Sequence, residues 1–201
     1  AVRVSNASTV GSLWTNNVFV ENAAGSLGGG IYVTGNDIAL YNNHFLANDA
    51  TTGGALYMTG SDFEFVNNLV AWTEDGDGME AVWSGTASYT LDYNNWYSNT
   101  TDDAVGDLSS SSLGANSLFV DPLLEDYSID GDCTNDELWP SSSSPLIDAG
   151  DPSTSLNDPD GSQSDIGAYG GPSADPDLFT DADGDGYLAI YDCDDNDASI
   201  N

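Results

Sequence analysis

GGIYVTGNDIALYNNHFLAND, residues Gly29–Asp49, is followed by a similar stretch, GGALYMTGSDFEFVNNLVAWTED, residues Gly53–Asp75. A third copy runs from Gly78 to Thr100, and a weaker one precedes them at Val10–Asn22. One glycine recurs at intervals of 25 residues, as Gly35, Gly60 and Gly85. A period of this length that is sustained over several copies indicates a repeat architecture.

Each copy contains short segments in which apolar and polar residues alternate, for example around Ile38 and Leu40 or around Phe63 and Phe65. A period of two is typical of strands, and no amphipathic helical pattern is present. Short strands separated by Gly, Asn and Asp fit a coil whose turns stack in parallel, about 4.8 Å apart. The sequence therefore predicts an all-β fold, a parallel β-solenoid.

Pairs of asparagines recur once per copy and suggest corners of this coil. Asparagine tolerates left-handed backbone geometry, and amides that stack at one corner can hydrogen-bond from coil to coil as a ladder. A second polar row follows Asn22, Asn48, Thr73 and Asn99. The alternative is a set of Asn-rich surface loops. We expect the ladder to consist of the first residue of each pair, Asn16, Asn42, Asn67 and Asn94.

The segments SLFVDPLL (Ser117–Leu124) and SSPLIDAGDPSTSLNDPDGSQSDIGAYGGP (Ser143–Pro172) resemble the closing segment of secreted pectin-lyase-like proteins. The resemblance implies a right-handed parallel β-helix over residues 1–172, with the last coil and a terminal cap at about 117–172. Two features depart from the family pattern. An acidic insert, SIDGDCTNDEL, lies between Tyr127 and Trp139, and no capping helix is recognisable near the N-terminus.

The charge is extreme, with 34 acidic residues against one basic residue, Arg3, and a formal net charge of −33. Such a surface cannot pair with phosphates, which excludes nucleic acid as a partner and argues against anionic membranes. The absence of an apolar run of 18 residues argues against membrane insertion. We expect bound cations or a high-salt environment to suppress the self-repulsion.

Residues 173–201 are expected to form a linker followed by an acidic calcium-binding loop, which begins DADGDGYLAIYD. The D-x-D-x-D-G spacing with a further aspartate at the twelfth position matches calcium loops. The stretch resembles thrombospondin type 3 and dockerin loops and the MopE-type metal-binding repeats, which imply copper. Carboxylates favour calcium over copper, and a solvated tail without an ion is the alternative. The candidate ligands are Asp181, Asp183, Asp185, Tyr187 (through its carbonyl), Asp192, Asp194, Asp195 and Asp197.

A second acidic turn places Asp158, Asp160 and Asp165 around Gly161. It suits either another calcium ion or Asx-turns. The two cysteines, Cys133 and Cys193, form either one disulfide or two free thiols.

Catalysis is not expected, because polysaccharide lyases of the β-helix fold need a basic residue and the chain offers only Arg3 and the single histidine, His44. The start of the sequence lacks a signal peptide pattern, which suggests a mature or excised piece. We expect a secreted, calcium-binding protein with a structural or adhesive role at the cell surface. An uncapped first coil favours head-to-tail homo-oligomers or filaments. The alternative is a calcium-dependent carbohydrate-binding module, or a lyase or hydrolase, with a polysaccharide ligand.

Overall fold

The computed structural model describes residues 2–5, 11–35, 37–60, 62–83, 88–108, 113–132, 134–180, 182–184 and 189. Apart from one 3₁₀ turn, η2 (Pro176–Phe179), the regular elements in these residues are strands. No helix there is long and apolar enough to cross a bilayer. The strands of the repeat region are β1 (Val2–Ser5), β2 (Ser12–Thr15), β3 (Val18–Val20), β4 (Ala23–Leu27), β5 (Ile31–Thr34), β6 (Ile38–Tyr41), β7 (His44–Leu46), β8 (Asp49–Thr52), β9 (Leu56–Thr59), β10 (Asp62–Val66), β11 (Leu69–Ala71), β12 (Met79–Val82), β13 (Ser88–Asp92), β14 (Asn95–Tyr97) and β15 (Ala104–Gly106).

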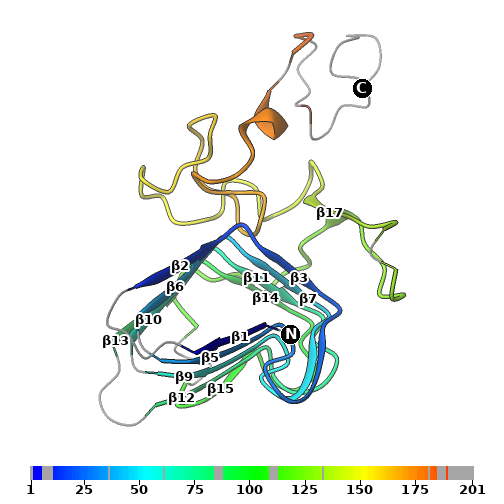
Figure 1. Cartoon of the computed structure of the whole chain (residues 1–201). Coiled ribbons are helices and arrows are strands. Elements are labelled where there is room, and N and C mark those ends of the chain that lie inside the picture. Colours follow the sequence, from blue (N-terminus) through cyan, green and yellow to red (C-terminus); the bar gives the residue numbers. More distant parts are fainter. Residues whose placement is uncertain are drawn as a thin grey trace.

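These strands stack into three long parallel sheets, which form the sides of a roughly triangular coil (Figure 1). Sheet A has the order β1-β5-β9-β12-β15, sheet B the order β2-β6-β10-β13, and sheet C the order β3-β7-β11-β14. A short parallel pair, β4 and β8, covers part of the return from sheet C to sheet A. The predicted all-β parallel solenoid, about four turns long, is confirmed.

Residues that are one sequence period apart lie opposite each other in neighbouring strands of the sheets. Ile38 of β6 lies opposite Phe63 of β10, and His44 of β7 lies opposite Leu69 of β11. Hydrogen bonds between asparagines on successive coils join residues that are 25 or 26 positions apart. The repeat is therefore the length of one coil.

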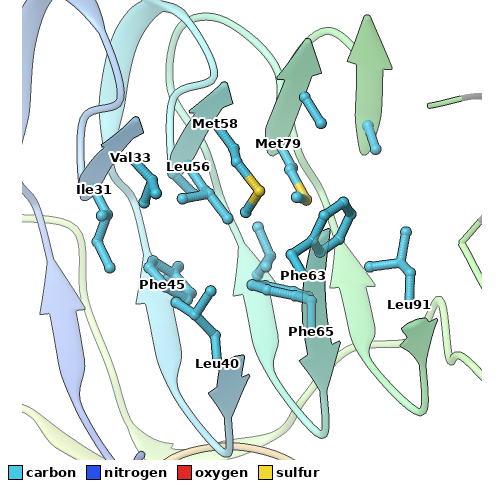
Figure 2. Close-up of a cluster of buried hydrophobic side chains, with 14 of the residues drawn as sticks. Ile31, Val33, Leu40, Phe45, Leu56, Met58, Phe63, Phe65, Met79 and Leu91 are labelled. Carbon is cyan, nitrogen blue, oxygen red and sulfur yellow. The ribbon is translucent and has the colours of Figure 1, made fainter. Parts of the chain in front are cut away.

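The interior of the coil is filled by columns of apolar side chains that face inward from all three sheets (Figure 2). Like residues stack on like. The rings of Phe19 and Phe45 are parallel with centroids 5.0 Å apart, and Phe65 stacks on Trp96 at 5.8 Å. Aromatic stacking of this kind adds to the stabilisation from area burial.

The chain beyond the repeats leaves the coil after a last bridge to sheet C. Leu118 bridges to Asn95 and so extends sheet C by one position. The chain then forms an antiparallel hairpin, β16 (Leu124–Asp126) and β17 (Glu137–Pro140), which contains the acidic insert. Residues 141–171, called the strap below, lie outside the corner between sheets B and C (Figure 1). The strap therefore runs along the side of the solenoid.

The strap covers the outer face of sheet C, which would otherwise expose apolar side chains to solvent. The outer face of this sheet carries apolar side chains as its inner face does, and β7 and β11 are buried at every position. Inward residues such as Phe45 and Val70 join the main core, while Leu46, Leu69 and Ala71 face outward into a second cluster with Leu146 and Ile166 of the strap. A sheet that is buried on both faces reads as a continuous apolar run in sequence.

Candidate functional site

The corner between sheets B and C is built from buried asparagines, among them Asn42, Asn43, Asn67, Asn68 and Asn94. The backbone turns through left-handed geometry at Asn16 (φ 54°), Asn42 (φ 52°) and Asn67 (φ 58°), as expected for asparagine. At the fourth corner this position is Tyr93 (φ 55°), so Asn94 is equivalent to the second asparagine of the earlier pairs.

The amide ladder runs one residue later than we expected. The side-chain amide of Asn17 donates to Asn43 Oδ1 at 2.9 Å, Asn43 donates to Asn68 Oδ1 at 2.9 Å, and Asn68 donates to Asn94 Oδ1 at 3.1 Å. The predicted ladder of Asn16, Asn42, Asn67 and Asn94 is thus correct only for Asn94. In the second polar row, Asn22 donates to Asn48 and Thr73 to Asn99.

The first asparagines of the pairs instead bind the strap. The Asn16 amide donates to the carbonyls of Ala168 and Gly170, at 2.9 and 2.7 Å. The Asn42 amide donates to the carbonyl of Asp165 at 2.8 Å. Asn67 Oδ1 accepts from the Asp151 amide at 2.8 Å, and the Asn67 amide donates to Ser164 Oγ. Three successive coils therefore present one column of amides that docks the strap.

His44 lies beneath the strap and is completely buried. Neither ring nitrogen has a hydrogen-bond partner, and burial lowers the pKa of the imidazole to about 3. The ring meets Tyr169 edge-on at 5.5 Å, and a Cβ placed on Gly167 would lie 2.0 Å from Nε2. The neutral imidazole is therefore packed between sheet C and the strap. The other candidate base, Arg3, lies over the ring of Tyr32 at 5.3 Å.

The second acidic turn lies in the strap, where its carboxylates accept backbone hydrogen bonds. Asp158 accepts from the amides of Asp165 and Gly171, Asp165 accepts from Asp148, and Asp160 accepts from Ser162. Burial raises the pKa of Asp158 to about 6 and that of Asp165 to about 7, although these backbone bonds oppose the shift. Asp160 alone forms an Asx-turn, because it accepts from the amide two residues further on. The bonds of Asp158 and Asp165 join segments of the strap that are 7 to 17 positions apart. A calcium ion there stays a prediction.

The predicted tail site lies almost wholly outside the described residues. This holds for Asp181, Asp185, Tyr187, Asp192, Asp194, Asp195 and Asp197, and for both cysteines, Cys133 and Cys193. Asp183 is described, within residues 182–184. In the described part of the chain, no group of three or more His, Cys, Asp or Glu side chains is arranged to hold a metal ion. The tail ligands and the disulfide therefore stay predictions.

A cluster of acids that the sequence did not reveal forms where the hairpin meets the solenoid. Three buried oxygens lack a hydrogen-bond partner: Glu21 Oε1, Asp136 Oδ2 and the Tyr127 hydroxyl. Burial raises the pKa of Tyr127, and the negative charges of Glu21, Asp136 and Glu74 raise it further. Asp136 belongs to the acidic insert, so the insert adds negative charge to an acidic corner. Its separation of more than 100 positions from Glu21 in the sequence concealed the pairing.

Comparison with known proteins adds no assignment. No family model matches the sequence, and neither the curated proteins nor the solved structures include a match.

Proposed function

We propose that this chain is a secreted, calcium-binding β-solenoid with a structural or adhesive role at the cell exterior. The observation that carries the proposal is the ratio of 34 acidic residues to one basic residue in a chain that folds around a packed core. Like charges at this density must be balanced by counter-ions, and carboxylates are hard oxygen ligands that suit calcium. In this proposal the coil is right-handed and pectin-lyase-like, and the acids of residues 181–197 hold the calcium.

The proposal gives the acids of the solenoid a supporting role. Asp158 and Asp165 are buried beside each other, and the negative charges of Glu21 and Asp136 both act on the buried Tyr127 hydroxyl. A pair of like charges such as Asp158 and Asp165 destabilises the fold unless a proton or a cation lies nearby. Millimolar calcium outside the cell supplies such a cation.

Assembly is the part of the proposal that microscopy tests. In the described residues, β1, β2 and β3 form one edge of the three sheets, and sheets A and B end at β15 and β13 on the other. Edges of this kind carry unpaired backbone groups, and a contact between unlike ends extends without closing. We expect light scattering and electron microscopy to show linear assemblies in millimolar calcium and their dissociation in EDTA. Monodisperse single particles in both conditions would contradict the head-to-tail model.

A further inference from the structure

A groove of about 590 Å³ lies on the outer face of sheet B. Its floor is one register position in four successive strands, occupied by Leu13, Ala39, Glu64 and Thr90. Phe63 and Phe65, on either side of Glu64, face inward into the core, so the groove residues face solvent. Leu13 is the most exposed large apolar residue among those described, at 67%. The groove crosses the coils and therefore runs along the axis of the solenoid.

Acidic groups line this groove. Asp37, at φ 64°, directly precedes β6 and lies at one side with Asp62, the first residue of β10, and Glu64 lies in the floor. Tyr41 forms the other side and donates its hydroxyl to Glu64. Burial and the Glu64 carboxylate together raise the pKa of this phenol, so Tyr41 stays a neutral donor. No basic side chain belongs to the lining.

The chemistry of the lining selects among ligands. An acidic polysaccharide would be repelled by three carboxylates. A peptide cannot join the sheet here, because the groove lies on a face whose backbone groups are already paired between strands. The hydroxyls of Ser88 and Thr90 and the aliphatic surface of Leu13 and Ala39 suit a pyranose ring, which has polar edges and apolar faces. Asp37 and Glu64 lie on successive coils but are offset by two positions along the strands, because Glu64 is opposite Ala39. This diagonal spacing, about 8 Å from the coil separation and the rise per residue, suits a polymer that carries cationic groups on neighbouring units.

We propose that the outer groove of sheet B binds an amine-bearing polysaccharide, with ammonium groups of successive glucosamine units paired to Asp37 and Glu64. Such pairs are charge-assisted hydrogen bonds, which are stronger than neutral ones. The site goes beyond the proposed calcium role, because its carboxylates bind an organic cation and its ligand is a cell-wall type of polymer. Such a polysaccharide is the binding partner that an adhesive role of the solenoid requires.

Calorimetry with a glucosamine hexamer tests the site in the calcium-loaded protein. We expect one hexamer to bind per chain and the double variant Asp37→Asn/Glu64→Gln to weaken binding at least tenfold, as loss of two charge-assisted bonds implies. The matched control is Glu125→Gln/Asp126→Asn, which removes the same charge from exposed residues of the β16–β17 hairpin. Binding in the control should change less than twofold. An equal loss in both double variants would show that net charge alone attracts the hexamer and would overturn the proposal.

Two comparison ligands and one further variant make the test independent of folding defects. The N-acetylglucosamine hexamer, which lacks the ammonium groups, should bind at least tenfold more weakly to the unaltered chain. Hexalysine should bind more weakly than the glucosamine hexamer, and a tighter fit of hexalysine would reassign the groove to basic peptides. Leu13→Ser should weaken the glucosamine hexamer without a change in charge, and unchanged binding in this variant would contradict the apolar floor. Calcium-dependent melting is expected to be the same in all these variants, so failure of the groove leaves the calcium proposal standing.

Discussion

Replacement of Asn68 by alanine should lower the free energy of unfolding by about 4 kcal/mol. Asn68 is completely buried and its amide donates to the carbonyls of Leu40 and Val66 and to Asn94 Oδ1. Its own Oδ1 accepts from both the backbone and the side-chain amide of Asn43. The substitution leaves several buried groups without partners, and each such group costs about 1–3 kcal/mol.

Equilibrium urea unfolding checks this value. Asn135→Ala is the matched control, because Asn135 is exposed and its side chain donates only to Asp130 at 3.3 Å. We expect the control to change stability by less than about 0.5 kcal/mol, as is usual for surface substitutions. A loss below about 1 kcal/mol in Asn68→Ala would show that the ladder is not a principal support of the coil.

The second large effect is expected from Gly167→Ala in the strap. Gly167 has φ 106°, which a residue with a side chain rarely adopts, and the new Cβ would lie 2.0 Å from His44 Nε2. The buried ring has no room to move, so the strap must shift away from the solenoid. Left-handed strain contributes about 1–2 kcal/mol and overpacking about 1–3 kcal/mol, so we expect a loss of about 3 kcal/mol. Hydrogen exchange should show faster opening of the strap amides.

The cause of this loss can be separated from backbone strain. Gly161 also has a positive φ, 91°, but a Cβ there would meet nothing within 4 Å. Gly161→Ala should therefore cost only about 1–2 kcal/mol, the backbone contribution. A second substitution, His44→Ala, should recover part of the loss caused by Gly167→Ala, because residues in contact are energetically coupled. If the two substitutions are simply additive, the proposed contact between strap and histidine is wrong.

Much of the fold could be predicted from the sequence, because equivalent positions of successive coils recur in the chain at intervals of one coil length. Inward residues such as Leu40 and Phe65 recur at the coil length, and the corners recur with them. The one-residue error in the ladder has a physical cause. Asparagine is favoured both at the left-handed corner and in the ladder, so an Asn-Asn pair does not say which residue has which role. The fourth corner, where Tyr93 is the left-handed residue, resolves the ambiguity.

The position of the strap was less predictable. Residues 141–171 lack regular strands in the structure, so no periodicity marks where they pack. The informative signal lay in sheet C, where the outward residues include Leu46, Leu69 and Ala71, at positions that a solvent-exposed face would make polar. The corners at which the chain leaves the strands of sheet C were also not predicted. Their left-handed residues are Glu21, Ala47, Trp72 and Ser98, and none of these types favours that geometry.

The residues that meet between the hairpin and the solenoid could not be predicted from the sequence either. The acidic insert was recognisable as a departure from the family pattern, but its partner on the solenoid was not. Only the folded chain brings Asp136 towards Glu21 and places both beside Tyr127. Both carboxylates add negative charge around this phenol in a chain whose net charge is already −33.

The most direct test of the account is the denaturation midpoint of the chain with and without calcium at constant ionic strength. A site that binds calcium only in the folded state stabilises it by about 2.7 kcal/mol when calcium exceeds the dissociation constant a hundredfold. We predict that calcium raises the midpoint, that EDTA reverses the effect, and that an equal ionic strength of sodium chloride does not replace calcium. An identical midpoint in calcium and in EDTA would contradict the claim that bound divalent cations hold this acidic solenoid together.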